Sequence, residues 1–320
     1  MPPDLTELTE SLTPLALLGI PIAIVGAVFL AVGAQLQHRG VGKVDARTKA
    51  ALAASNQASD ALTPPVQSTA GLSMSQLFAL ARRPSWLFGS LLLGLAIVAQ
   101  LTSLGLSPIT LVQPLGAVAL VITAVINART TGARLDRLSI RAIAFCVLGV
   151  AIFVTLAAFT TTSRPVSNGQ LIVILSILGV VTLAFAVLFA FYRNRFKALM
   201  YIIGAGVLYG FVATLAKVVI DRTKTGDFLD GLTLLCVVAL LAATVLGGYF
   251  VQNAYASGPP DLVIAGLTVI DPLIAVSIGI VVLNEAAGAP WFAVLGFVGA
   301  GIIAIYGVFQ LSKHHPQTQH

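Results

Sequence analysis

Charged side chains are scarce in this 320-residue sequence. Asp, Glu, Lys and Arg together make up 9% of it, against roughly 25% in a typical soluble domain. Hydrophobic residues make up 58%, and a water-soluble fold has no interior large enough to bury that much apolar surface. The composition therefore excludes a soluble globular protein and predicts an all-α polytopic membrane protein.

Cysteine and histidine are also rare. The two cysteines, Cys146 and Cys236, both lie in apolar runs, so a disulfide framework of the secreted type is not expected. The sequence has no metal-ligand spacing and no nucleotide-binding loop. We therefore expect no cofactor, no bound metal, no enzymatic activity and no ATP-driven pumping by this chain alone.

The first 13 residues contain three acidic residues and no Lys or Arg. This is the wrong charge for the start of a cleaved signal peptide, so the first apolar run is expected to remain as a membrane helix.

Nine apolar runs are long enough to cross a bilayer, which takes about 20 helical residues. Polar or Pro/Gly-containing segments separate them. The nine predicted spans are Leu15–Gln37, Ser85–Leu106, Ile109–Asn127, Leu138–Phe159, Gly169–Tyr192, Leu199–Ile220, Gly231–Ala254, Leu262–Leu283 and Trp291–Leu311.

Lys and Arg are distributed unevenly between the two sides that nine spans define. Segments after the odd-numbered spans hold 14 of the 18 basic residues when Arg141, near the start of the fourth span, is counted with the loop before it; the opposite side holds 3, and Lys217 lies inside the sixth span. Basic residues concentrate on the cytoplasmic side, which predicts a plasma-membrane protein with its N-terminus outside and its C-terminus in the cytoplasm. This orientation also explains the basic pI of about 9.6 without nucleic-acid binding.

Two segments of the sequence share one pattern. Residues 110–115 read Thr-Leu-Val-Gln-Pro-Leu and residues 268–273 read Thr-Val-Ile-Asp-Pro-Leu, 158 residues apart. Thirteen residues beyond each proline lie Asn127 and Glu285, which are expected to end the two helices with related polar groups. Because the two spans run in opposite directions, the pattern predicts an inverted repeat, an architecture common in transporters.

The repeat divides the chain into two halves of four spans joined by a connecting helix. The long cytoplasmic loop is expected to be a solvated linker, and its end, Met74–Arg83, can form a short interfacial helix. The predicted parts are an N-terminal tail (1–14), a first repeat (15–159) with its loop (38–84), a connecting helix (160–198), a second repeat (199–311) and a C-terminal tail (312–320).

Both motifs contain a proline, which removes one backbone hydrogen bond from a helix. Pro114 and Pro272 are therefore expected to break their helices and free the carbonyls of Thr110 and Thr268. Inside a bilayer, such carbonyls are tolerated where they meet protein, water or a ligand. Alternatively, each proline only kinks its helix for packing.

Asp271 lies at the centre of the eighth span, where a carboxylate costs about 2.5 to 3.5 kcal/mol on insertion scales. Such a residue is rarely retained for packing alone. We expect Asp271 and its counterpart Gln113 to form a central site for a proton, a cation, or a cationic or hydroxyl-rich substrate group.

Three other polar residues lie inside spans. Lys217 either extends to the outer interface or pairs with Asp271 or an anionic substrate. Gln100 and Tyr209 lie deeper and are candidate residues of the pathway wall.

Several segments resemble bacterial, EamA-like members of the drug/metabolite transporter superfamily. They are residues 82–86, 103–115, 256–259 and 268–273, with Asn284-Glu285. The start, Ile20–Gln37 followed by His38-Arg-Gly-Val41, is similar to the NIPA-type magnesium transporters, which also have nine spans. The resemblance implies secondary transport along the paired proline helices, although most members of the superfamily have ten spans.

The function expected from these features is secondary transport of a small organic metabolite or drug, coupled to protons or a cation. The alternatives are a NIPA-like magnesium transporter, a flippase for a lipid-linked substrate and a non-transporting scaffold. Because the chain contains both halves, we expect a monomer or a homodimer in the lipid bilayer.

Overall fold

The computed structural model describes residues 17–37, 84–131, 137–192, 198–257 and 260–313. Within these ranges nine helices are long and apolar enough to cross a membrane, and there is no strand. The protein is therefore an all-α polytopic membrane protein, as its composition predicts. The N-terminal tail, residues 314–320 of the C-terminal tail, nearly all of the long loop and the Met74–Arg83 segment lie outside the described residues.

The helices match the predicted spans to within a few residues at most ends. The first described helix is Leu17–Gln37. In chain order it is followed by α4 (Pro84–Leu106), α5 (Ile109–Val112), the 3₁₀ helix η1 (Gln113–Gly116), α6 (Ala117–Thr131), α7 (Arg137–Thr160), α8 (Asn168–Tyr192), α9 (Ala198–Thr225), α10 (Gly231–Ser257), α11 (Pro260–Val281) and α12 (Trp291–Lys313).

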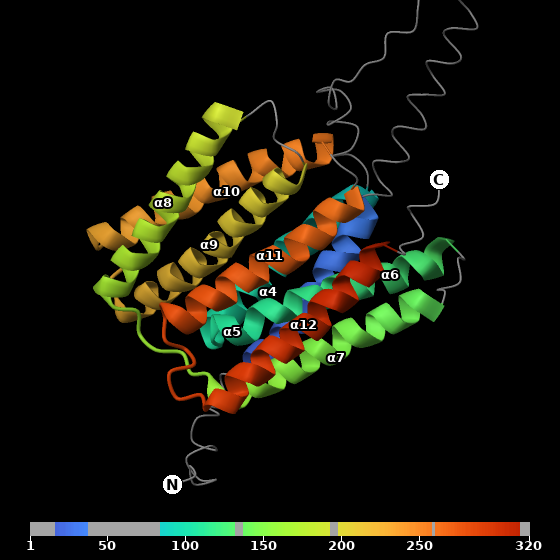
Figure 1. Cartoon of the computed structure of the whole chain (residues 1–320), viewed down its shortest axis with the longest axis horizontal. Helices are drawn as coiled ribbons and strands as arrows, with labels where there is room; N and C mark the ends of the chain where they lie inside the picture. Colours follow the sequence, from blue (N-terminus) through green and yellow to red (C-terminus); the bar gives the residue numbers. More distant parts are fainter. Residues whose placement is uncertain (1–16, 38–83, 132–136, 193–197, 258–259, 314–320) are drawn as a thin grey trace, which may run out of the picture.

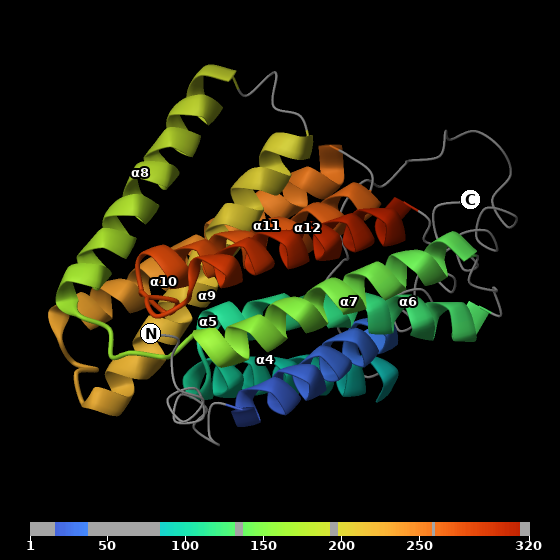
Figure 2. The same ribbon diagram turned by 60° about the horizontal axis from the view of Figure 1, so that its bottom comes forward.

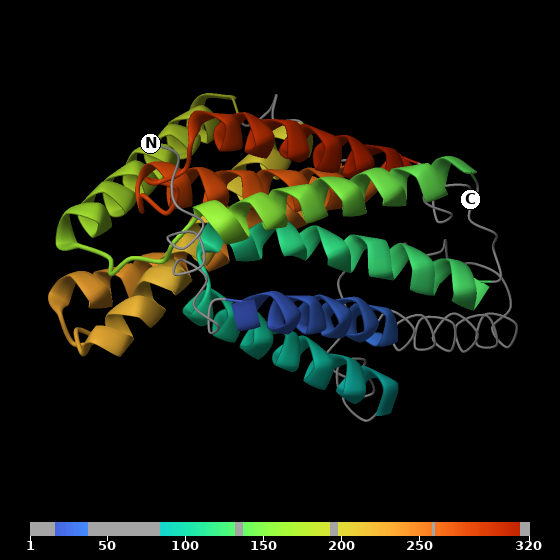
Figure 3. The ribbon, with the colours of Figure 1, turned by 90° about the horizontal axis from the view of Figure 1, so that it is seen from below.

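The helices form one bundle in which α8 lies at an edge, beside α9 and α10 (Figures 1 and 2). α11 packs against α9 and α12, and α12 packs along α7. The first described helix lies beside α4, on the side of α6 and α7 (Figure 3). This arrangement leaves the middle of the bundle bordered by the first described helix, α4, η1, α6, α9 and α11.

Large apolar side chains cover the outside of the bundle. Examples are Phe88 on α4, Val180 and Phe191 on α8, Val245 on α10 and Trp291 on α12, each more than half exposed. In water such a surface would cause aggregation, whereas in a bilayer it contacts lipid tails. The outward faces therefore fit a membrane-embedded bundle.

Only one of the two proline helices is interrupted within the part of the chain described. Span three changes to 3₁₀ geometry at Gln113–Gly116, whereas α11 continues through Pro272 to Val281. The prediction of two broken helices is therefore wrong for the second one. Pro114 follows a single helical turn, while Pro272 has about three turns before it and two after it, and the remaining hydrogen bonds of those turns hold the helix together.

Small residues allow the central helices to approach closely. A Cβ atom added at Gly206 or Gly210 of α9 would lie 2.7 Å from the Cβ atom of Ile270 or Ile274, respectively, on α11. These glycines therefore form the packing surface between α9 and the helix that carries Asp271.

The contact between α7 and α12 is symmetric. A Cβ added at Gly149 of α7 would lie 2.8 Å from the carbonyl oxygen of Ala300, and one added at Gly307 of α12 would lie 2.8 Å from that of Ala142. Gly307 follows Gly149 by 158 residues, and Ala300 follows Ala142 by the same number. This is also the spacing of the two proline motifs, so the contact agrees with an inverted repeat whose halves meet through equivalent surfaces.

Candidate functional site

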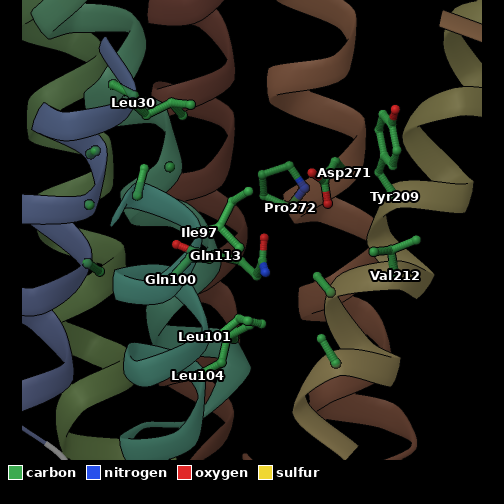
Figure 4. Close-up of a pocket in the computed structure, with 18 of the residues that line it drawn as sticks. Leu30, Ile97, Gln100, Leu101, Leu104, Gln113, Tyr209, Val212, Asp271 and Pro272 are labelled. Carbon is green, nitrogen blue, oxygen red and sulfur yellow. The ribbon is translucent and has the colours of Figure 1, made fainter. Parts of the chain in front are cut away.

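A cavity of about 470 Å³ lies in the middle of the bundle (Figure 4). Its walls come from both halves of the chain, and most of its lining is apolar. The lining residues are Ala23, Gly26, Ala27, Leu30, Ala96, Ile97, Gln100, Leu101, Leu104, Gln113, Gly116, Ala119, Tyr209, Val212, Ala213, Ala216, Leu267, Thr268, Asp271 and Pro272.

The polar lining residues include the central pair predicted from the repeat. Gln113 from η1 and Asp271 from α11 are directed into the same space, and Tyr209 lies beside Asp271 (Figure 4). Gln100 and Thr268 also line this cavity. The structure thus places the side chains of these five predicted residues around one space, although their roles remain predictions.

Asp271 is the charged residue among those that line the cavity. Its Oδ1 atom is buried and has no hydrogen-bond partner in the described part of the chain. A buried carboxylate oxygen is costly to leave unpaired. Because Asp271 lies in the cavity wall, its side chain is accessible to a ligand, and a ligand could supply the missing partner.

Five predicted residues do not belong to this lining: Thr110, Pro114, Asn127, Lys217 and Glu285. Pro114 lines a smaller neighbouring cavity of about 90 Å³ together with Pro272. The hydroxyl of Thr110 donates to Glu285, whereas that of Thr268 donates to its own helix at Ile264. The two threonines of the repeated motif therefore have different partners.

Lys217 on α9 pairs with Asp221 and not with Asp271, so the predicted pairing with Asp271 is wrong, whereas its extension to the interface and its pairing with an anionic substrate stay predictions. Its side chain is 2% exposed, and its Nζ atom lies 3.2 Å from the carboxylate of Asp221. It also donates to the carbonyl of Leu104 at 3.0 Å and to the hydroxyl of Ser163 at 2.8 Å. Asp221 lies one helical turn away, close enough to satisfy the ammonium within the same helix.

Glu285 has a role that the sequence reading missed. Its Oε1 accepts a hydrogen bond from the N–H of Ile109 at 2.8 Å, and its Oε2 accepts one from the N–H of Thr110 at 2.9 Å. These are the first two free N–H groups of α5, whose preceding residue, Pro108, provides no side-chain cap. The lack of a local cap was the sequence signal that an acid from elsewhere was needed.

The turn before Glu285 explains how the carboxylate reaches back. Asn284 has a φ of 55°, a left-handed conformation that Asn tolerates better than most residues. The chain reverses there, and Glu285 is 2% exposed between the two halves. Burial raises the pKa of Glu285 above its ordinary value, partly offset by the hydrogen bonds from Thr110 and Ile109 and by the charge of Lys217.

The predicted equivalence of Asn127 and Glu285 at helix ends does not hold. Asn127 lies inside α6, which continues to Thr131, whereas Glu285 lies beyond α11, which ends at Val281. α6 continues through a short polar stretch, while the second half turns sharply at Asn284.

The contacts of Lys217 and Glu285 connect the two halves at one end of the cavity. Leu104 lines the cavity, and its carbonyl, in the first half, accepts from Lys217 in the second half. Glu285, in the second half, binds the start of α5 in the first half. We call these two sets of contacts the outer polar seal, using the predicted orientation, in which this end faces outward.

Comparison with known proteins gives limited information. No family model matches the chain, and no solved structure matches it. Over 220 residues, 67% of this chain and 74% of the relative, it is 27% identical to an uncharacterized protein of Corynebacterium glutamicum. This relative therefore indicates no substrate or activity.

Proposed function

We propose that this protein is a secondary transporter that moves a small organic metabolite or drug across the plasma membrane by alternating access. The observation that carries the proposal is the central cavity between the two halves, with the unpartnered Oδ1 of Asp271 in its wall. Ionisable residues at membrane depth mark substrate or ion pathways far more often than packing sites.

The outer polar seal supports this proposal. Alternating access requires contacts that close one end of a central site and can exchange with contacts at the other end. Hydrogen bonds from Lys217 to Leu104 and from Ile109 and Thr110 to Glu285 join opposite halves in this way. The symmetric contact of α7 with α12 supports the same mechanism, since equivalent halves can exchange their arrangements.

The proposal also includes three expectations that rest on the sequence patterns. They are membership in the drug/metabolite transporter superfamily, an orientation with the N-terminus outside, and a role that is not enzymatic. Because both halves of the cavity wall come from one chain, a monomer is sufficient for the proposed cycle, although a homodimer is compatible with it.

A dedicated magnesium site is less well supported. Mg²⁺ binds through carboxylate oxygens and retained waters, and Asp271 is the one acid among the residues that line the cavity. Within the described part of the chain, no group of three or more His, Cys, Asp or Glu residues could hold a metal ion. The cavity therefore favours an organic solute.

A thermal-stability screen followed by transport measurement tests the proposal. The purified protein is heated with Mg²⁺, amino acids, sugars, cationic drugs and polyprenyl phosphates, and each stabilising compound is then tested for uptake into proteoliposomes. A ligand at 100 times its Kd stabilises by about 2.7 kcal/mol. We expect Asp271→Asn to abolish uptake while the protein stays folded.

Asp227→Asn is the matched control because Asp227 is half exposed on the turn between α9 and α10. It should transport like the wild type. A scaffold would tolerate both substitutions, and stabilisation by Mg²⁺ alone, lost in Asp271→Asn, would establish the magnesium alternative. Transport of a lipid-linked compound would indicate a flippase.

A further inference from the structure

We infer that the substrate is a monovalent organic cation with an apolar body, whose positive charge lies against Asp271. This inference rests on the proposed transport function and names the chemical class that the cavity fits. Four observations support it: the charge of the cavity lining, the small number of hydrogen-bonding groups in that lining, its one aromatic ring, and the volume of the cavity.

The charge of the lining is negative when Asp271 is ionised. The nearest basic side chain on α9, Lys217, does not line the cavity and is paired with Asp221 at 3.2 Å. An anionic ligand would therefore lie close to a carboxylate without a compensating cation in a medium of low dielectric constant. A cation would instead supply the partner that Asp271 Oδ1 lacks.

The remaining lining has few groups that can form hydrogen bonds. Apart from Asp271, the polar side chains are Gln100, Gln113, Tyr209 and Thr268, and the hydroxyl of Thr268 already donates to its own helix. A sugar or another hydroxyl-rich solute would leave many of its groups unpaired, which disfavours such a ligand. The side chains of Ala, Leu, Ile, Val and Pro make up the rest of the lining, together with two glycines, and they suit a hydrocarbon or aromatic body.

Tyr209 adds a second group that favours positive charge. It is the one aromatic residue of the lining, and its ring stands beside Asp271 across α9 and α11 (Figure 4). The face of an aromatic ring attracts organic cations such as quaternary ammonium groups. Asp271 and Tyr209 together can therefore hold a cationic head group.

The size of the cavity separates an organic cation from an inorganic one. About 470 Å³ is within the range of roughly 300–1,000 Å³ found for drug-sized ligands. A single Na⁺ or Mg²⁺ would leave most of this apolar space unfilled. The volume and the single carboxylate therefore indicate one charge on a large body.

A set of probes that differ in charge tests this inference. The full-length protein in detergent is heated with three cations (tetraphenylphosphonium, ethidium and trimethyl(3-phenylpropyl)ammonium), with two anions (tetraphenylborate and 4-phenylbutyrate) and with neutral triphenylphosphine oxide. We expect at least one cation to raise the Tm of the wild type, while the anions and the neutral compound do not.

Variants of Asp271 assign the effect to the site. Asp271→Asn should weaken cation binding about 10- to 100-fold, as expected for the loss of a charge-assisted contact, and Asp271→Glu should retain part of it. Asp227→Asn should bind like the wild type. Cation binding that is unchanged in Asp271→Asn would overturn the inference, as would a screen in which no cation acts.

Uptake into proteoliposomes distinguishes failure of this inference from failure of the proposed function. If an anionic or neutral compound binds and is transported, the protein is a transporter and the inference about cations is wrong. If cations bind at Asp271 but neither they nor any other compound that binds is transported, the binding site stands as a cation site and the transport proposal fails.

Discussion

Thr110 donates two hydrogen bonds to Glu285, from its backbone N–H at 2.9 Å and from its hydroxyl at 2.6 Å, across 175 positions of the chain. With the bond from Ile109, three donors at the start of α5 meet one carboxylate from the opposite half. The short helix at the start of the interrupted span is thus completed by the other repeat.

Glu285→Gln should destabilise the protein by about 1–3 kcal/mol, because an amide offers one acceptor oxygen and leaves a buried N–H of α5 without a partner. The measurement is thermal unfolding in detergent at neutral pH. Asp227→Asn provides the control, since it removes a half-exposed carboxylate. Equal stability of both variants would show that Glu285 does not hold α5.

The raised pKa of Glu285 predicts how the contribution of this residue to the stability of the folded protein changes with pH. Because burial raises the pKa in the folded state, the folded protein binds more protons than the unfolded chain between the ordinary Glu value and the raised one. Stability therefore falls as the pH rises through that window. The difference in Tm between wild type and Glu285→Gln should shrink from low to high pH. A difference that grows with pH would mean that the donors and Lys217 outweigh burial.

Lys217→Met should loosen the outer polar seal, because Asp221, Leu104 and Ser163 all lose a partner. A thiol reporter at Ala213, which lines the cavity, measures this. A weakening of the closed state by 1–2 kcal/mol corresponds to about 5- to 30-fold faster labelling from the outer side. The native Cys146 and Cys236 are buried and give the background rate.

Arg164→Met is the control for Lys217→Met. Arg164 is an exposed basic residue next to Ser163, so its loss changes the charge at the same end without removing the seal. Its labelling rate should match that of the wild type. Unchanged labelling in Lys217→Met would show that these contacts do not restrict access.

Gly307→Ala should destabilise the bundle by about 1–3 kcal/mol, since the added methyl group would overlap the backbone of α7 near Cys146, and overpacking of this kind forces helices apart. Gly301→Ala on the same helix meets nothing within 4 Å and should be neutral or slightly stabilising. Thermal unfolding of both variants provides the test. A similar loss in both would contradict the close contact of α7 with α12.

The predicted orientation can be tested with single cysteines and a membrane-impermeant thiol reagent. Asp227→Cys, between α9 and α10, should be labelled in intact cells, whereas Arg137→Cys, at the start of α7, should be labelled after permeabilisation only. The uneven distribution of Lys and Arg is the physical reason. The reverse pattern would invert the orientation and make the seal an inner one.

The features predicted correctly from the sequence are those set by bilayer length and by repetition. The nine predicted spans match the nine long apolar helices in the described part of the chain, since a membrane span must satisfy its own backbone hydrogen bonds. The repeated motif predicted Gln113 and Asp271 at one central site, and both line the same cavity, although their role there stays a prediction.

The features that the sequence did not predict depend on short-range geometry. The partner of Lys217 was decided by Asp221 one turn away rather than by the deeper Asp271. The reach of Glu285 depends on the left-handed turn at Asn284, and the continuity of α11 depends on the turns that flank Pro272. The i, i+4 spacing of Lys217 and Asp221 did contain a signal for their pairing, whereas composition and spacing contain no information about the turn at Asn284 or the continuity of α11.

The symmetric contact of α7 with α12 has a consequence for synthesis of the protein. Gly307 leaves the ribosome 158 residues after Gly149, a delay of about 10–30 s at typical elongation rates. During this time the small-residue face of α7 lacks its final partner. We expect chains that stall before α12 to expose this face in the membrane and to be removed by quality-control proteases.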